Sequence, residues 1–273
     1  MTLKIYGMLR SRAARNAWMC EELGVKYEKV PVMQAYRLAD PHAPGAPLNT
    51  LSPAFRKINP NGHIPTIDDD GLVLHESLAI NLYLARKHGG PLAARDVRED
   101  GQIAMWTLWA ANEVEPAATT IVQNAGKDQK AVDEAAARLP GPFAVLAAAL
   151  KEGNGHLVGG RFTVADLNVA EVLRYAQPAR GLFEAQPTVK AWIEACQAQE
   201  GLRRHLRAAA DGAGGDAFTL EVGDGLDRAA LGDEEVDGLG IEGNQRAQVF
   251  LRLALERALA DVGVVVEAVR EAD

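Results

Sequence analysis

The spacing of hydrophobic residues changes once along the chain, at Gly89-Gly90-Pro91. Before this point, short apolar stretches of strand length alternate with amphipathic helical stretches. After it, apolar residues recur every three or four positions, a spacing typical of helices. Because Gly-Gly-Pro also ends helices, the pattern predicts two domains, an α/β domain over residues 1–88 and an all-helical domain over residues 97–210.

Four strands and three helices are expected in the α/β domain. The order strand, helix, strand at its start predicts a parallel pair of strands. The last two strands flank Asp69-Asp70-Gly71, and Asp-Gly between short strands predicts a hairpin. The expected strands are residues 3–7, 27–32, 65–68 and 72–74, and the expected helices are residues 12–23, 52–58 and 76–87.

The second domain is expected to contain four long helices, over residues 102–125, 127–152, 164–176 and 187–198, and a short one from Gly201. Thr163-Val164-Ala165-Asp166 predicts an N-terminal capping box at the third of these helices. In a capping box, the Thr163 hydroxyl and the Asp166 carboxylate each accept a backbone N–H from the other residue. We interpret this motif as structural.

Charge separates the last 62 residues from the rest of the chain. Residues 212–273 carry 14 acidic and 5 basic residues, whereas the preceding 211 residues carry 23 acidic and 24 basic residues. Residues 222–243, rich in Gly and Asp, are expected to lack fixed structure, and residues 244–262 have a helical pattern. This acidic tail is either an added helix that packs on the body or on a partner, or a segment without a selected fold.

Composition excludes several classes of protein. Hydrophobic residues make up 48% and charged residues 24%, as in ordinary globular proteins. No apolar run approaches the ~20 residues that span a bilayer, and the N-terminus has no targeting pattern. Cys20 and Cys196 are too few for a disulfide framework or a metal site. We expect a cytoplasmic protein with reduced thiols and no metal, membrane or nucleic acid partner.

Three short elements carry candidate chemistry. Ser11 stands where the first helix begins, so its hydroxyl and the helix N-terminus can stabilise an anion such as a thiolate. Pro65 opens a strand after a Gly-containing turn; a cis bond before it would turn the Ile64 backbone outward to pair with an extended peptide. Glu76 and Ser77 open the third helix and can bind the ammonium and carboxylate of an α-amino acid end. Ordinary helix caps and a trans proline on an edge strand explain the same residues without function.

Taken together, these segments resemble the glutathione-binding half of the cytosolic glutathione transferases. The matching motifs are Ser11-Arg12-Ala13-Ala14-Arg15, Asn59-Pro60-Asn61-Gly62, Ile64-Pro65-Thr66-Ile67 and Leu74-His75-Glu76-Ser77-Leu78-Ala79-Ile80. The resemblance extends from Met1 to about Ala210 and is to the serine-type classes, theta- and phi-like, including bacterial members. It implies a thioredoxin-like N-terminal domain followed by a helical-bundle C-terminal domain, and a homodimer.

The resemblance also implies roles for individual residues. Ser11 matches the catalytic hydroxyl, and Tyr6 is a second candidate for it, although the end of a strand suits packing better. A serine at this position disfavours thiol–disulfide exchange, which uses a cysteine. A basic residue that often contacts the glycine end has no match at Thr50 or Leu51. Glutathione itself is expected to be held by His63 at the glycine carboxylate, by Ile64 and cis Pro65 at the cysteinyl backbone, and by Glu76 and Ser77 at the γ-glutamyl end.

The electrophile is expected to bind between the domains. Trp106, Trp109 and Glu113 have the spacing of one helical face, and aromatic residues with this spacing more often form a core or a dimer interface than a binding site. The expected reaction joins the glutathione thiolate to a small hydrophobic electrophile, a detoxification chemistry. Glutathione-dependent peroxide reduction and a non-enzymatic glutathione-binding scaffold remain as alternatives. The candidate electrophile-site residues are Met8, Leu9, Trp106, Trp109 and Asn112.

Overall fold

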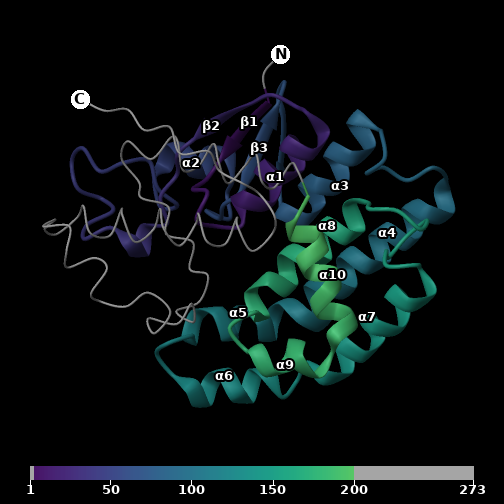
Figure 1. The fold of residues 1–273 in the computed structure, drawn as a ribbon. Helices are drawn as coiled ribbons and strands as arrows, with labels where there is room; N and C mark the ends of the chain where they lie inside the picture. The colour runs from purple at the N-terminus through teal and green to yellow at the C-terminus, as the bar shows by residue number, and fades with distance from the viewer. Residues whose placement is uncertain (1–2, 200–273) are drawn as a thin grey trace, which may run out of the picture. The chain divides into compact units, whose positions relative to one another are not determined.

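The computed structural model describes residues 3–199, which form a four-stranded sheet with its helices and a set of helices that follows it (Figure 1). The strand order is β2-β1-β3-β4, with β1 parallel to β2 and antiparallel to β3. The predicted parallel pair is therefore confirmed. The acidic tail and the short helix expected from Gly201 lie outside the described residues. The strands are β1 (Leu3–Tyr6), β2 (Tyr27–Val30), β3 (Thr66–Asp69) and β4 (Leu72–His75).

The predicted hairpin between β3 and β4 is confirmed. Its two turn residues both have positive φ, 57° at Asp70 and 90° at Gly71. Two-residue hairpin turns of this kind match the twist of the flanking strands, and Asp-Gly tolerates the left-handed backbone they need. The side chain of Asp68 also accepts a hydrogen bond from the Gly71 N–H at 2.8 Å, so the turn is closed by residues within itself.

The two faces of the sheet bury alternate residues of β1. Leu3 and Ile5 belong to the large core that includes α1 and α3, whereas Tyr6 belongs to a small cluster with Val32 and Phe55 of α2. This alternation is the two-residue period of a strand. It places α1 and α3 on one side of the sheet and α2 on the other. The helices of this part are α1 (Ala13–Leu23), the 3₁₀ turn η1 (Ala35–Arg37), α2 (Pro53–Ile58) and α3 (Ser77–His88).

The helical part departs from prediction at three places. The helix expected over residues 127–152 is wrong as a single element, because Pro140 has no N–H to continue a helix and instead starts a new one. The helix expected over 102–125 is interrupted by a π-helical turn, and α9 was not predicted. The elements are α4 (Val97–Trp109), the π-helix η2 (Ala110–Val114), α5 (Glu115–Asn124), α6 (Gln129–Ala136), α7 (Pro140–Glu152), α8 (Val164–Leu173), the 3₁₀ turn η3 (Arg174–Ala176), α9 (Arg180–Ala185) and α10 (Pro187–Gln197).

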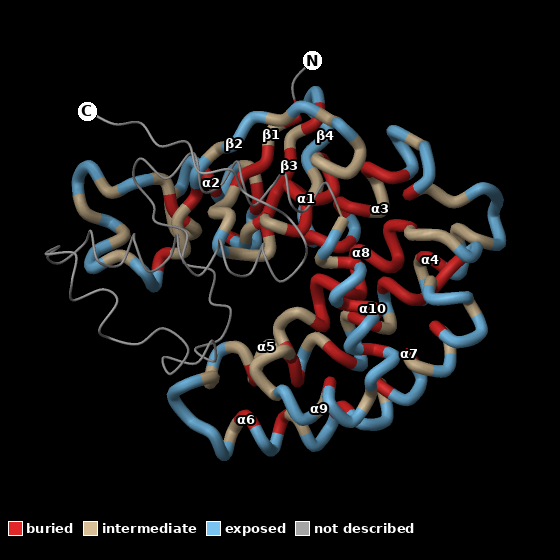
Figure 2. Tube along the Cα trace, viewed as in Figure 1, coloured by how far each residue is buried: buried red, intermediate tan, exposed pale blue. Residues whose placement is uncertain are grey.

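Helix α8 lies at the centre of the described structure. All ten of its residues are buried (Figure 2), and it packs against α1 and α3 as well as against α4, α5 and α10. The predicted capping box at its start is present: Asp166 accepts the Thr163 N–H at 2.9 Å. A helix buried on every side must be apolar all round or have each polar side chain satisfied. In α8, the cap satisfies Asp166, Asn168 pairs with Asn81 and Thr107, and Glu171 accepts from Arg174.

The two cysteines are core residues. Cys20 and Cys196 are both buried and unpaired. Burial raises the pKa of the Cys20 thiol to about 12 and also raises the pKa of the Cys196 thiol. Within residues 3–199, no helix is long and apolar enough to cross a membrane, and no group of His, Cys, Asp and Glu side chains could hold a metal ion.

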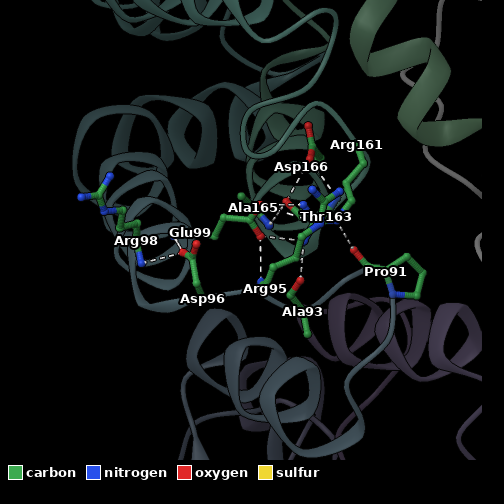
Figure 3. Close-up of polar contacts among 10 residues, drawn as sticks. All are labelled: Pro91, Ala93, Arg95, Asp96, Arg98, Glu99, Arg161, Thr163, Ala165 and Asp166. Atoms are coloured by element: carbon green, nitrogen blue, oxygen red, sulfur yellow. Dashed lines mark hydrogen bonds and ion pairs between the residues drawn. The ribbon is translucent and has the colours of Figure 1, made fainter.

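The segment between α3 and α4 is held by Arg161, which precedes α8 (Figure 3). Its guanidinium donates to the backbone oxygens of Pro91 at 3.1 Å and Ala93 at 2.7 Å, and to both carboxylate oxygens of Glu99 at 3.0 and 2.8 Å. Gly159 has a φ of 66°, which favours glycine, and a Cβ there would lie 2.2 Å from Arg161 Nη1 and displace the guanidinium from this position. One arginine therefore ties the linker, the start of α4 and the loop before α8.

The Glu99–Arg161 pair is expected to give a measurable pH dependence of stability. Hydrogen bonds from Arg161 lower the pKa of Glu99 from 4.5 to about 2. Since the folded pKa lies below the unfolded value, the stabilisation is complete above about pH 5 and is lost as pH falls toward about 2. Glu99→Gln should cost about 1–2 kcal/mol near neutral pH, because the pair is bidentate but close to solvent.

Thermal unfolding of the parent and of Glu99→Gln at several pH values would measure this difference. The gap in Tm should shrink steadily below about pH 4.5. Glu134→Gln is the matched control, because Glu134 faces Lys130 at 3.8 Å with both side chains exposed. A gap for Glu99→Gln that is independent of pH would contradict the prediction.

Candidate functional site

Ser11 lies in the turn between β1 and α1. Its hydroxyl donates to the Met8 carbonyl at 2.6 Å and accepts the Ala13 N–H at 3.1 Å. The helix begins at Ala13 rather than at the predicted residue 12. Ser11 thus closes the turn as a cap does, and it stands at the positive end of α1, where N–H groups favour a neighbouring anion.

The peptide bond between Ile64 and Pro65 is cis, as the resemblance implied. The buried side chain of Asn59 holds the segment before it, donating to the His63 carbonyl at 2.9 Å and to Thr66 Oγ1 at 3.0 Å. The ladder between β1 and β3 ends at the pair Tyr6–Thr66. Ile64 therefore lies beyond the paired part of β3, half-buried, and His63 beside it is exposed.

Glu76 joins β4 to α3 in a conformation that L residues rarely adopt, with φ 70° and ψ 103°. Such a backbone costs free energy and persists where surrounding contacts impose it, often at functional sites. The turn leaves the Glu76 side chain exposed, while Ser77 is buried at 5% exposure as the first residue of α3. The carboxylate and the hydroxyl thus belong to the two consecutive residues at the N-terminus of the helix.

A chain of buried amides connects Ser77 to α8. Asn16 Nδ2 donates to the Ser77 carbonyl at 2.8 Å and to Asn81 Oδ1 at 2.7 Å. Asn81 in turn donates to Asn168 Oδ1 at 2.8 Å, and Asn168 donates to Thr107 Oγ1 at 3.2 Å. The start of α3 is therefore positioned from α1 on one side and from α8 on the other.

The candidate electrophile-site residues lie in different surroundings. Met8 and Leu9 are half-buried beside Ser11, and Asn112 is exposed. Trp106 is buried at 8% exposure, and its ring meets that of half-buried Trp109 edge-on at 5.1 Å. The core interpretation holds for Trp106.

The predicted common face of Trp106, Trp109 and Glu113 is wrong. The π-helix from Ala110 to Val114 adds a residue to one turn and shifts the phase of the helix. Glu113 is consequently exposed, whereas Val114 is buried.

Tyr6 packs in the core, as its position at the end of a strand suggested. Its ring lies 6.4 Å from that of Phe55, and it is 9% exposed. It belongs to the cluster on the α2 side of the sheet, together with Val32.

Comparison with known proteins agrees with this geometry. A sequence model described as the N-terminal domain of glutathione S-transferase matches residues 5–92, and one described as the C-terminal domain matches residues 109–200. The chain is 32% identical over 223 residues to glutathione S-transferase 3 of Zea mays, covering 76% of this chain and 94% of that protein. The chain belongs to the glutathione S-transferase family.

Solved structures of the family share the fold of this transferase. Glutathione S-transferase I from maize, in complex with an atrazine glutathione conjugate, matches with a TM-score of 0.64 and 29% identity, over 76% of this chain and 97% of that one. A theta class enzyme of Xanthomonas axonopodis pv. citri with glutathione bound matches with a TM-score of 0.62 and 25% identity, over 75% and 96%. The chain is thus a glutathione transferase with a thioredoxin-like domain and a helical domain, and glutathione is its co-substrate.

Sequence reasoning about this transferase missed a charged cluster beside Ser11 and Ser77. Arg12 Nε and Arg15 Nη2 both donate to Glu115 Oε1, at 2.6 and 3.0 Å. Burial acts to raise the pKa of Glu115, but the two guanidinium groups prevail and lower it. The sequence contained one sign of this cluster. Arg15 is a charged residue on the buried face of the first helix, and a buried charge needs a partner.

Proposed function

We propose that this transferase joins the glutathione thiolate to small hydrophobic electrophiles in the manner of the serine-type classes, theta and phi. The observation that carries the proposal is the meeting of three elements far apart in sequence. A Cβ on Gly7 would lie 3.4 Å from the Cβ of Ile64, and Arg15 reaches the Ser77 hydroxyl at 3.2 Å. The turn that holds Ser11 is therefore adjacent to the cis proline, and the helix that follows this turn contacts the start of α3.

Glutathione fits this arrangement as an extended peptide with charged ends. The backbone of Ile64, turned by the cis bond to Pro65, pairs with the cysteinyl residue. Glu76 binds the γ-glutamyl ammonium, and Ser77 with the α3 N-terminus binds the γ-glutamyl carboxylate. His63, exposed beside Ile64, contacts the glycine carboxylate, since neither Thr50 nor Leu51 supplies a positive charge.

In the proposed reaction, the glutathione thiol releases its proton to water and the sulfur forms a bond to an electrophilic carbon. Either the leaving group departs with its electron pair, or the electrons of a double bond move onto the electrophile, which then takes a proton from water. When glutathione binds, the Ser11 hydroxyl exchanges its hydrogen bond to the Met8 carbonyl for one donated to the thiolate, and the α1 N-terminus lowers the thiol pKa below its ordinary value of ~8.5. Bringing sulfur and carbon together supplies much of the remaining rate.

The proposed electrophile wall joins the two parts of the molecule. Met8 and Leu9 supply apolar surface next to Ser11, while Trp109 and Asn112 contribute from the helical side; Trp106 is left out because it is buried in the core. The atrazine conjugate in the maize relative supports a flat, apolar electrophile, as does the half-buried ring of Trp109.

Affinity and turnover test the proposed function together. The full chain should be retained on immobilised glutathione and eluted by free glutathione. It should then conjugate at least one member of a panel that holds a chlorinated nitroaromatic, an epoxide, an α,β-unsaturated carbonyl and an organic hydroperoxide. Retention without any turnover would indicate a scaffold, and turnover of the hydroperoxide alone would indicate a peroxidase. Either result would refute the proposed conjugating function.

We also propose that the transferase is a homodimer. Apolar side chains are exposed on the edge strand β4, at Leu72 (44%) and Val73 (39%), and on α4, at Met105 (52%) and Leu108 (61%). Exposed apolar surface on an edge strand and a helix suits contact with a second copy. Light scattering after gel filtration should give about twice the 29.2 kDa of one chain; a mass of one chain at micromolar concentration would contradict the dimer.

A cytoplasmic location is proposed from the state of the thiols. Cys20 and Cys196 are both unpaired, which suits a reducing compartment. Fractionation of cells that express the chain would test this location, and recovery in a membrane or secreted fraction would oppose it.

A further inference from the structure

Arg12 follows Ser11 directly, and one edge of its guanidinium is fixed while the other is open. Nε donates to Glu115 Oε1 at 2.6 Å and Nη2 donates to Thr119 Oγ1 at 3.2 Å, both in α5. Within residues 3–199, no hydrogen bond involves its Nη1. The side chain is 42% exposed, whereas that of Arg15 is 1% exposed. Arg12 is therefore a cation in a fixed position that still has N–H donors directed away from its protein partners.

Arg12 stands between the turn that holds Ser11 and the part of the helical domain that is proposed to bind the electrophile. Its protein partners both lie in α5. Asn112, a residue of the proposed electrophile wall, lies three positions before Glu115 and is exposed. Arg12 therefore lies where the sheet side and the helical side of the proposed electrophile site approach each other.

Tyr175 places an aromatic surface against the same guanidinium. It is half-buried in η3, and the centroid of its ring lies 5.9 Å from the guanidinium carbon of Arg12. A guanidinium on an aromatic face is oriented by the ring as well as by its hydrogen bonds. An aromatic surface beside a fixed cation suits a ligand with an apolar body and one anionic group.

The charge of Arg12 is only partly compensated by the protein. Its partner Glu115 also accepts a hydrogen bond from Arg15 at 3.0 Å, so one carboxylate serves two guanidinium groups. The other acidic group near Arg12 is Glu76, which is exposed and is proposed to bind the ammonium of glutathione. Surplus positive charge thus remains on Arg12, the more exposed of the two arginines, where an anion can reach it.

We propose that Arg12 is a specificity-determining residue of the electrophile site, and that this transferase prefers electrophiles whose apolar body carries a carboxylate. This inference rests on the proposed conjugating function and narrows it to a substrate class. The carboxylate accepts hydrogen bonds from Nη1 of Arg12 while the electrophilic carbon meets the sulfur beside Ser11. Because Glu115 and Thr119 already hold the guanidinium in place, little side-chain freedom is lost when the substrate binds.

The test compares two electrophiles, 4-chloro-3,5-dinitrobenzoate and its methyl ester, with glutathione at saturation. In both, the sulfur forms a bond to the ring carbon and chloride leaves with its electron pair, but only the benzoate is charged. Each kcat/KM is divided by the rate constant of the uncatalysed reaction with glutathione, which removes the difference in intrinsic reactivity. The parent should then favour the benzoate by about 10-fold, the lower end of the range for a hydrogen bond to a charged group, because Arg12 is partly open to solvent.

Arg12→Met and Arg12→Gln should both lower this preference to less than about threefold, because each removes the charge that meets the carboxylate. Arg12→Gln retains an amide donor and covers the case in which Arg12→Met does not fold. The KM for the benzoate should rise in both variants, while kcat/KM for the ester stays within about threefold of the parent. Higher ionic strength should weaken the preference of the parent but not of the variants, since partly exposed charges are screened. General damage to the site would give neither result.

Arg10→Met is the matched control. Arg10 is exposed, lies in the same turn and directly precedes Ser11, so this variant removes the same charge from the same segment. The preference for the benzoate should stay within about twofold of the parent, because an exposed charge without a fixed position is largely screened by solvent and salt.

The outcomes separate the inference from the proposed function. If the parent turns over neither compound nor any other electrophile, the conjugating function is refuted and the inference falls with it. If the parent conjugates neutral electrophiles but does not prefer the benzoate, the inference is refuted and the conjugating function stands. A preference that persists in folded Arg12→Met or Arg12→Gln, or that is lost equally in Arg10→Met, would likewise overturn the role of Arg12.

Discussion

Replacing Ser11 by alanine is expected to lower kcat/KM for conjugation by about 100-fold or more. Removal of one hydrogen-bond donor that stabilises an anion in an active site typically has an effect of about this size. The variant loses the one hydroxyl placed at the α1 N-terminus, so the pKa of bound glutathione should rise toward its ordinary value. Affinity for glutathione should stay within about threefold of the parent, because the peptide is held by Ile64, Glu76 and Ser77. Steady-state kinetics with a chlorinated nitroaromatic and the pH dependence of kcat/KM would measure both effects.

Two companion variants make this result specific. Ser11→Ala also removes the contacts to the Met8 carbonyl and the Ala13 N–H, a loss worth about 1 kcal/mol for a cap, so Tm must be measured alongside. Ser11→Thr keeps a hydroxyl and should recover part of the rate. Tyr6→Phe removes the other candidate hydroxyl, which is buried against Phe55, and should leave turnover unchanged. Undiminished turnover in Ser11→Ala would remove Ser11 from the mechanism.

Loss of the Asp166 carboxylate is expected to destabilise the protein by about 3–5 kcal/mol. Asp166 is fully buried and accepts the backbone N–H groups of Thr163 at 2.9 Å and Leu157 at 3.0 Å, and the indole N–H of Trp192 at 3.3 Å. Asp166→Ala leaves these donors without a partner and opens a space at the start of α8. Since α8 packs against α1 and α3, the damage should extend to the glutathione site.

Urea denaturation of Asp166→Ala and Asp96→Ala would check this prediction. Asp96 caps α4 in the same way, accepting the N–H groups of Arg98 and Glu99 at 2.8 and 2.9 Å. Because it is exposed, water replaces the lost bonds, and the cost should be about 1 kcal/mol. Equal costs for the two variants would show that burial of Asp166 contributes nothing to its effect.

Local features of the fold could be predicted from the sequence. The hairpin turn at Asp70-Gly71, the end of α1 at Gly24 and the cap between Thr163 and Asp166 each depend on residues within four positions of one another. Their causes are the left-handed backbone that Gly and Asp tolerate and hydrogen bonds that close within one helical turn. The helix break at Pro140 belongs to the same class and was missed, although a proline inside a helical pattern indicates a break.

The candidate site was only partly predictable. Ser11, Pro65, Glu76 and Ser77 became candidate site residues because their motifs in combination resemble those of a known family. Local chemistry was insufficient, since a cis bond occurs at only ~5–6% of prolines and each helix cap has a purely structural explanation. The π-helix between α4 and α5 was not predictable from spacing, because it inserts a residue into a pattern that otherwise reads as one continuous helix.

By itself, the sequence determined where strands, turns and helix ends lie, because steric limits and short-range hydrogen bonds act between neighbours in the chain. Only the tertiary structure decided which charges meet. Arg15 lies 62 positions from Ser77 and 100 from Glu115, and the three are brought together by the packing of α1 between α3 and the helical domain. No periodicity along the chain encodes that meeting, since it depends on how three separate elements bury their surfaces at once.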